Sequence, residues 1–222
     1  MGLDARYYIM NFAGTAARIN PKDYDEIISL GNRCATTMML RELGVYKQSY
    51  PFDYVPTTPD LILRWLKDSS SFYPERNVVR TKNGVWFGHF NISNNYDETI
   101  LVFKRRFDRL LDALRSKKRI LFVYSSEADV FNEMGNRYNR NYDTLLKIRK
   151  YIIDEYGYSN FTILAVHVNK NYSSFSNMVN LTINVHPSLL SDNMETHRDD
   201  ITHEYKRELK KALAEVFCQT PS

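Results

Sequence analysis

Cysteine and histidine offer the most direct chemistry in this chain of 222 residues, which holds two cysteines and five histidines. Cys34 follows the apolar run 25–30 and Gly31, and it precedes a helical pattern. A cysteine in the first turn of a helix lies beside unpaired backbone N–H groups, which stabilise a thiolate or an oxyanion. Cys34 is therefore a candidate nucleophile. A small buried residue that packs the turn is an equally good interpretation.

Three histidines follow predicted strands, at the ends where ligand sites form in open α/β sheets. His89 comes after the apolar residues 85–87 and a glycine, so its ring would project beyond the strand. We prefer His89 as the general base that activates the cysteine. A structural histidine bonded to loop carbonyls is the alternative. His167 and His186 end two later strands and are the next candidates.

Polar residues beside these positions complete the candidate site. Asp53 could orient an imidazole as the third member of a triad, or it could cap the turn at residues 51–54. Asn32 and Arg33 adjoin the cysteine and could bind an anionic or carbonyl group. The predicted substrate-binding residues are Asn32, Arg33, Asn91, Ser125, His167 and His186.

Composition and charge limit the possible partners. The chain is 43% hydrophobic, and 30 basic against 26 acidic residues give a net charge of +4, with both signs mixed along the sequence. This balance does not indicate a nucleic-acid partner. No apolar run reaches the ~18 residues that a membrane span needs, and the first residues lack the features of a secretory signal. We therefore expect no membrane association.

The two cysteines, Cys34 and Cys218, form neither a disulfide framework nor a CxxC metal motif. A reducing compartment, the cytoplasm, is the expected location. The sequence also lacks HExxH, a Cys/His knuckle, GxGxxG and GxxxxGK[ST]. We predict no metal and no cofactor.

Strand-like and helix-like segments alternate along the chain. Apolar runs predict strands at 25–30, 85–87, 119–124, 161–166 and 181–185, and amphipathic patterns predict helices at 34–43, 59–67, 97–115, 142–156 and 205–217. This order predicts an α/β three-layer domain with a mostly parallel sheet of about five strands flanked by helices. Residues 1–20 form an expected arm, and residues 21–222 form a single domain.

The sequence resembles a family of unknown function that is grouped with papain-like cysteine peptidases and occurs in bacteria and large DNA viruses. The resemblance rests on Ser29-Leu30-Gly31 followed by Cys34, on Pro51-Phe52-Asp53, and on Gly88-His89-Phe90, in the same order as in that family. It implies a nucleophile at Cys34, a base at His89 and an orienting role for Asp53. If the source is viral, the host cytoplasm is implied. A papain-like α+β fold, with a largely antiparallel sheet, is the alternative architecture.

A looser likeness links the turn at Cys34 to the Gly-Ser-Cys-Phe-Ala family of SGNH-type esterases, which are α/β three-layer proteins. Here Asn32-Arg33 stand at the serine position, and no Asp-x-x-His motif surrounds His186. Three functions stay open. The first is a cysteine-dependent hydrolase, which would be a peptidase or an acyl transferase. The second is an SGNH-like esterase or a glycan-modifying transferase. The third is a non-catalytic binding or scaffold protein. The corresponding substrates are a protein, a peptide or a glycan ester.

Overall fold

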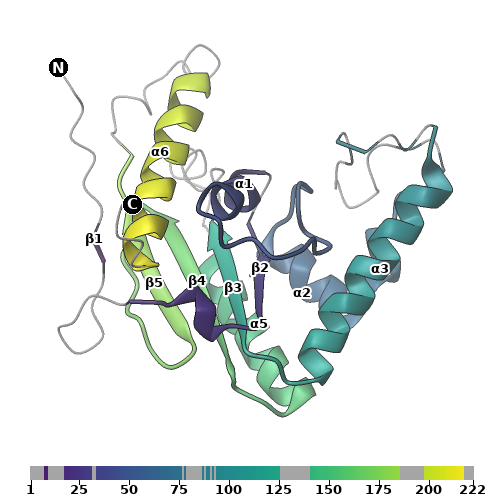
Figure 1. Ribbon diagram of the computed structural model, residues 1–222, viewed down its shortest axis with the longest axis horizontal. Coiled ribbons are helices and arrows are strands. Elements are labelled where there is room, and N and C mark those ends of the chain that lie inside the picture. Colours follow the sequence, from purple (N-terminus) through teal and green to yellow (C-terminus); the bar gives the residue numbers. More distant parts are fainter. Residues whose placement is uncertain are drawn as a thin grey trace.

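Within the described residues, the sheet has five strands in the order β1-β5-β4-β3-β2 (Figure 1). A computed structural model describes residues 8–9, 18–31, 34–76, 78, 87, 89–90, 92, 94–125, 141–185 and 198–217. The strands are β1 (Tyr8–Ile9), β2 (Glu26–Ser29), β3 (Ile120–Ser125), β4 (Phe161–Val168) and β5 (Met178–Ile183). The helices are α1 (Ala35–Glu42), α2 (Pro59–Lys67), α3 (Tyr96–Arg115), α5 (Asn141–Tyr156) and α6 (Arg198–Val216), with 3-10 turns η1 (Pro21–Asp23) and η2 (Ser69–Phe72).

Strands β2 to β5 are parallel, and β1 pairs antiparallel with β5. Strand β3 is buried along its whole length, as a strand covered on both faces must be. Parallel neighbours need crossover connections. Helices lie in the connections from β2 to β3 and from β3 to β4, whereas residues 169–177 join β4 to β5 without a helix. The predicted α/β three-layer fold is confirmed. The alternative of a papain-like α+β fold with a largely antiparallel sheet is wrong for the described sheet.

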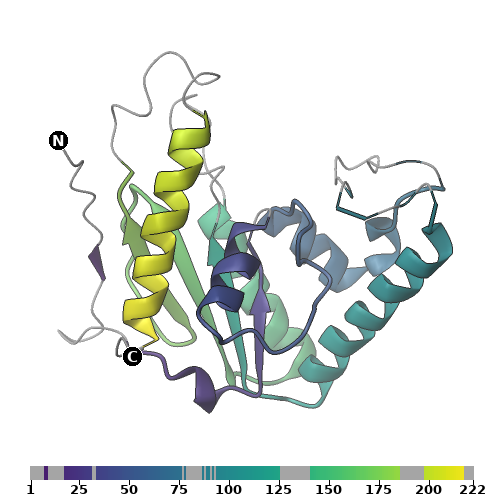
Figure 2. The same ribbon diagram turned by 45° about the horizontal axis from the view of Figure 1, so that its top comes forward.

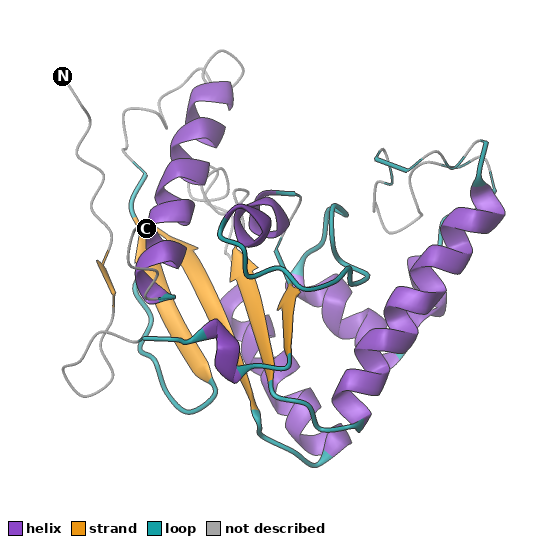
Figure 3. Ribbon diagram, in the orientation of Figure 1, coloured by secondary structure: helices purple, strands orange, loops and turns teal. Residues whose placement is uncertain are grey.

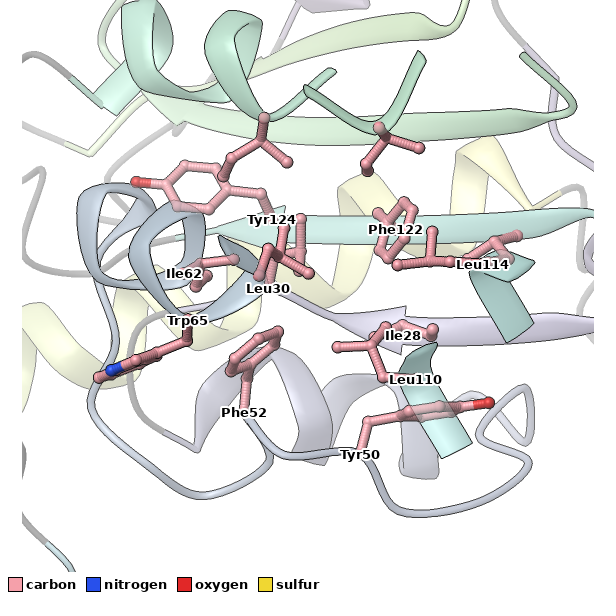
Figure 4. Packing of buried hydrophobic residues seen from close by; sticks show 14 of the residues in the cluster. Ile28, Leu30, Tyr50, Phe52, Ile62, Trp65, Leu110, Leu114, Phe122 and Tyr124 are labelled. Carbon is pink, nitrogen blue, oxygen red and sulfur yellow. The ribbon is translucent and has the colours of Figure 1, made fainter. Parts of the chain in front are cut away.

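Helices cover both faces of the sheet, and each face has its own hydrophobic core (Figures 2 and 3). On one face, α1 and α6 bury Leu40 and Leu213 against Val123 and its neighbours. On the other face, α2, α3 and α5 cover a larger core that is rich in aromatic side chains (Figure 4). These two layers hold the carboxyl ends of the described strands between them.

The aromatic core is organised around Phe72, whose ring meets four others at centroid distances of 4.9 to 5.3 Å. These partners are Trp65, Phe87, Phe103 and Phe107. Three of the four contacts are edge-to-face, the arrangement that aromatic quadrupoles favour. The core thereby joins α2 and α3 to the segment around Phe87, which leads into His89.

Local chemistry explains where several helices begin and end. The Thr58 hydroxyl accepts a hydrogen bond from the Leu61 N–H at the start of α2, and Pro59 follows as the first helical residue. After α1, Gly44 adopts φ +67, a left-handed conformation that suits glycine. The predicted bounds of α2 agree with the structure, and those of α3 and α5 agree to within one residue at their starts.

Four elements differ from the expectation. Strand β1 pairs with β5, although it lies in the segment expected to form an arm. Strand β5 begins at Met178 instead of 181, and α6 begins at Arg198 instead of 205. The sequence pattern did not reveal the start of β5, which follows a polar segment. In the structure, Asn177 turns the chain at φ +64 directly before the strand, and its side chain donates to the Phe161 carbonyl. The predicted strand at 85–87 lies outside the described residues except for Phe87, which is not in a strand. None of the described helices is long and apolar enough to cross a membrane.

Candidate active site

Cys34 and His89 meet although they are 55 positions apart in the sequence: the Cys34 Sγ and the His89 Nε2 are 3.4 Å apart. Cys34 is half-buried and His89 is exposed. A sulfur–nitrogen separation of this size permits a hydrogen bond, and therefore proton transfer from the thiol to the imidazole. The structure brings together the two residues that the sequence predicts as nucleophile and base.

The backbone that carries Cys34 is fixed by two close approaches. A Cβ atom on Gly31 would lie 1.8 Å from the Thr36 Oγ1 and 3.0 Å from the Ser125 carbonyl oxygen, so only glycine fits there. The Thr36 and Ser125 hydroxyls are 2.6 Å apart and both residues are fully buried. The first turn of α1 is thereby attached directly to the end of β3, and Cys34 stands immediately before that turn.

His89 lies between two anchored phenylalanines. Phe87 is fully buried against Phe72 and Phe103, and the Phe90 ring packs on Phe103 with a centroid distance of 4.7 Å. The Phe90 N–H also donates to the Phe87 carbonyl at 2.8 Å, which closes a turn around the histidine. The aromatic core therefore positions an exposed imidazole.

Tyr54 contacts the imidazole from the loop between α1 and α2. Its ring lies edge-on to the His89 ring with centroids 6.3 Å apart. Its backbone has φ +60, a left-handed conformation that is costly for a bulky side chain. The Arg41 guanidinium lies over the same ring, 5.5 Å from the centroid. The sequence places Tyr54 in an aromatic loop but gives no sign that its ring reaches the histidine.

Asp53 is buried, and its carboxylate accepts hydrogen bonds from three donors. These are the Thr37 hydroxyl at 3.0 Å, the Tyr46 hydroxyl at 2.7 Å and the Tyr50 N–H at 2.9 Å. Burial raises the pKa of the carboxyl group, while the three donors oppose that rise. These contacts agree with the interpretation of Asp53 as a cap of the turn at residues 51–54. They hold the loop in the shape that presents Tyr54.

Ser125 and His167 lie on opposite faces of the sheet. The Ser125 side chain points to α1, whereas the His167 ring packs against Tyr142 of α5 and the Tyr172 ring. The His167 Nε2 is 2.9 Å from the Asn180 Oδ1, and burial lowers the pKa of His167 to about 4. His167 is therefore a neutral core residue away from α1. Asn32, Arg33, Asn91 and His186 lie outside the described residues.

The sequence assigns no role to Arg106, a residue of α3 whose charge acts on Asp53 in the loop between α1 and α2. Its guanidinium lies over the rings of Phe90 and Phe103, 5.8 and 5.2 Å from their centroids. Its position within a charged helical surface carries no signal in the sequence. No cluster of three or more metal-ligating side chains occurs within the described part of the chain.

Comparison with protein families selects the segment that carries the cysteine. Residues 25–85 match the family model described as "Putative papain-like cysteine peptidase (DUF1796)". The match contains Cys34 and Asp53 and ends before His89. The resemblance drawn from the sequence motifs is thereby confirmed over these residues. No curated protein and no solved structure matches the chain.

Proposed function

We propose that the protein is a cysteine-dependent hydrolase or acyl transferase that acts on a protein or peptide substrate. The observation that carries the proposal is the 3.4 Å separation of the Cys34 Sγ and the His89 Nε2. The family match over residues 25–85 favours a peptidase over the other hydrolases. A reduced thiol is required for this chemistry, so we also propose a reducing compartment, the cytoplasm.

The reaction begins when the thiol proton of Cys34 passes to the His89 Nε2. The sulfur attacks the substrate carbonyl carbon and forms a C–S bond, and the negative charge moves to the carbonyl oxygen. Backbone N–H groups in the first turn of α1 are the available donors for that oxyanion. The tetrahedral intermediate then expels the leaving amine, which takes the proton from the imidazolium and leaves a thioester.

A second half-reaction releases the thioester. His89 takes a proton from water, the oxygen attacks the thioester carbon, and the C–S bond breaks to return the Cys34 thiolate and a carboxylic acid. If an amine or hydroxyl takes the place of water, the same steps transfer the acyl group. The SGNH-like esterase would need a serine, whereas the residue beside the described imidazole is a cysteine.

Thiol alkylation tests the pair without knowledge of the natural substrate. Iodoacetamide should label Cys34 at least about tenfold faster than the second cysteine, Cys218, as located by peptide mass spectrometry. The His89→Gln variant should slow the labelling of Cys34 by a similar factor, because it loses the base. Labelling of Cys34 that is no faster than that of Cys218, and insensitive to His89→Gln, would favour a non-catalytic protein.

Peptide hydrolysis completes the test. A mixed peptide library incubated with the protein should yield cleavage products by mass spectrometry, and Cys34→Ala should yield none. The Cys218→Ala variant is the matched control and should retain the activity. Cleavage that survives in Cys34→Ala would contradict the proposal.

A further inference from the structure

Arg106 is partly buried, and one of its guanidinium nitrogens has no acceptor among the described residues. Its NH1 atom is buried and has no hydrogen-bond partner among the described residues. Its described contacts are the rings of Phe90 and Phe103. Burial lowers the pKa of Arg106, which shows that its charge is poorly solvated. Binding of an anion stabilises a guanidinium in this state.

The charges around Arg106 leave an excess of positive charge. Arg41 and Arg109 both act on it electrostatically, and Asp53 is the carboxylate that opposes them. Asp53 is already held by three donors, and Arg109 donates to the Ser49 carbonyl. The described groups therefore leave the Arg106 NH1 without an acceptor, on a side chain that is only partly buried.

Two routes through the structure place Arg106 beside the candidate active site. Phe90, on which the guanidinium lies, directly follows His89. Asp53, whose pKa the Arg106 charge lowers, directly precedes Tyr54, and the Tyr54 ring contacts the His89 ring. An anion bound by Arg106 would accordingly lie near the group that reacts.

We propose that Arg106, assisted by Arg41, binds a carboxylate of the peptide substrate close to the bond that Cys34 attacks. This inference rests on the proposed function and specifies its substrate class as an acidic peptide. The planar guanidinium presents paired N–H donors that match the two oxygens of a carboxylate, which a lysine cannot do. The carboxylate is either a Glu or Asp side chain or the free end of a peptide.

Matched reactive peptides test the inference. Peptide chloromethyl ketones carrying Glu or Gln at the first, second or third residue from the ketone alkylate a thiolate, as the C–S bond forms and chloride leaves. We expect the Glu probe to inactivate the protein about tenfold faster than its Gln partner at one position or more. The Arg106→Met variant should bring that ratio close to one, and Arg106→Lys should retain part of it. Equal rates at all three positions in the unmodified protein would overturn the inference.

Binding without reaction separates this inference from the proposed function. Cys34→Ala cannot be alkylated at the candidate nucleophile, so fluorescence anisotropy can measure its affinity for labelled peptides. Four peptides form two matched pairs. One pair has Glu or Gln at an internal position, and the other ends in a free acid or an amide. Tighter binding of an acidic member, lost in Arg106→Met, supports the inference even if Cys34 proves unreactive, and shows which carboxylate is bound. Arg105→Met, at the exposed neighbouring position, is the control and should keep the preference. Equal affinity for all four peptides would contradict it.

Discussion

The hydroxyl groups of Thr36 and Ser125 lie 2.6 Å apart in the interior and join the first turn of α1 to the end of β3. Gly31 makes this contact possible, because any Cβ at that position would occupy the space of the Thr36 side chain. The Thr57 hydroxyl donates to the Gly31 carbonyl at 2.9 Å and fixes the same turn from the other side. The candidate nucleophile therefore depends on buried contacts for its position.

Removal of one hydroxyl of this pair should destabilise the fold. Thr36→Ala or Ser125→Ala leaves the other hydroxyl buried without its partner, which costs about 1–3 kcal/mol. The double variant should lose less than the sum of the two single losses, because both partners are then absent. Urea denaturation of the four proteins gives the coupling free energy. Strict additivity would show that the contact contributes nothing.

Gly31→Ala should alter both stability and the reactivity of Cys34. The added methyl group overlaps Thr36, and such overpacking costs about 1–3 kcal/mol of unfolding free energy. Because the turn must shift, the rate at which iodoacetamide labels Cys34 should also change. Gly44→Ala is the control. It meets no nearby atom, so it should lower stability through its positive φ alone and leave the labelling rate unchanged.

The role of the Tyr54 ring can be tested with two substitutions that suit the left-handed backbone at this position. Tyr54→Gly relieves the left-handed backbone but removes the ring from His89, and Tyr54→Asn keeps a residue that tolerates this conformation. Both variants should slow the alkylation of Cys34 by several-fold, with only a small loss of thermal stability. Alkylation at the original rate in both would show that the ring does not position the imidazole.

Asp53→Asn distinguishes a turn cap from the third member of a triad. An amide cannot accept from all three donors that surround the carboxylate, so unfolding free energy should fall by about 1–3 kcal/mol. Asp53→Glu should also destabilise, because the buried site has no room for the longer side chain. A variant with full stability and greatly reduced labelling of Cys34 would instead support the triad role.

His167 should make stability depend on pH. Its pKa is about 4 in the folded protein and near 6.5 in the unfolded chain, so the unfolded chain binds the extra proton between these values. Unfolding free energy should therefore fall by about 3 kcal/mol as the pH drops from 6.5 to 4. Denaturation at several pH values should show a shallower slope for His167→Gln. Identical slopes in the two proteins would show that burial does not affect this histidine.

The sequence predicted the α/β layers and named Cys34 and His89 as candidate partners, although Phe87, in the strand expected before His89, is not in a strand. Apolar runs and amphipathic periods mark the strands and helices, and the rule that sites form beyond strand ends selects the turn at Cys34. The same rule also selected His167, which the structure buries on the face away from α1. Position at a strand end does not reveal which face a side chain occupies, because that depends on the register.

The surroundings of the site depend on contacts between distant segments, and local patterns do not encode these. Arg106 is an unremarkable charged position of α3 until Phe90 folds beneath it. The left-handed Tyr54 follows Asp53, whose carboxylate accepts from the Thr37 hydroxyl of α1 and from the Tyr46 hydroxyl of the same loop. Such features required the structure.

The loop between α1 and α2 also contacts the chain at both ends of the edge strand β2. Strand β2 is the last strand of the described sheet, and such an edge can pair with another chain. The Lys47 side chain donates to the Tyr24 and Asp25 carbonyls at one end of β2, and Thr57 donates to the Gly31 carbonyl at the other. The loop that presents Tyr54 to His89 is thus attached to the chain at both ends of this edge strand. Substitutions that loosen this loop should promote aggregation as well as impair the site.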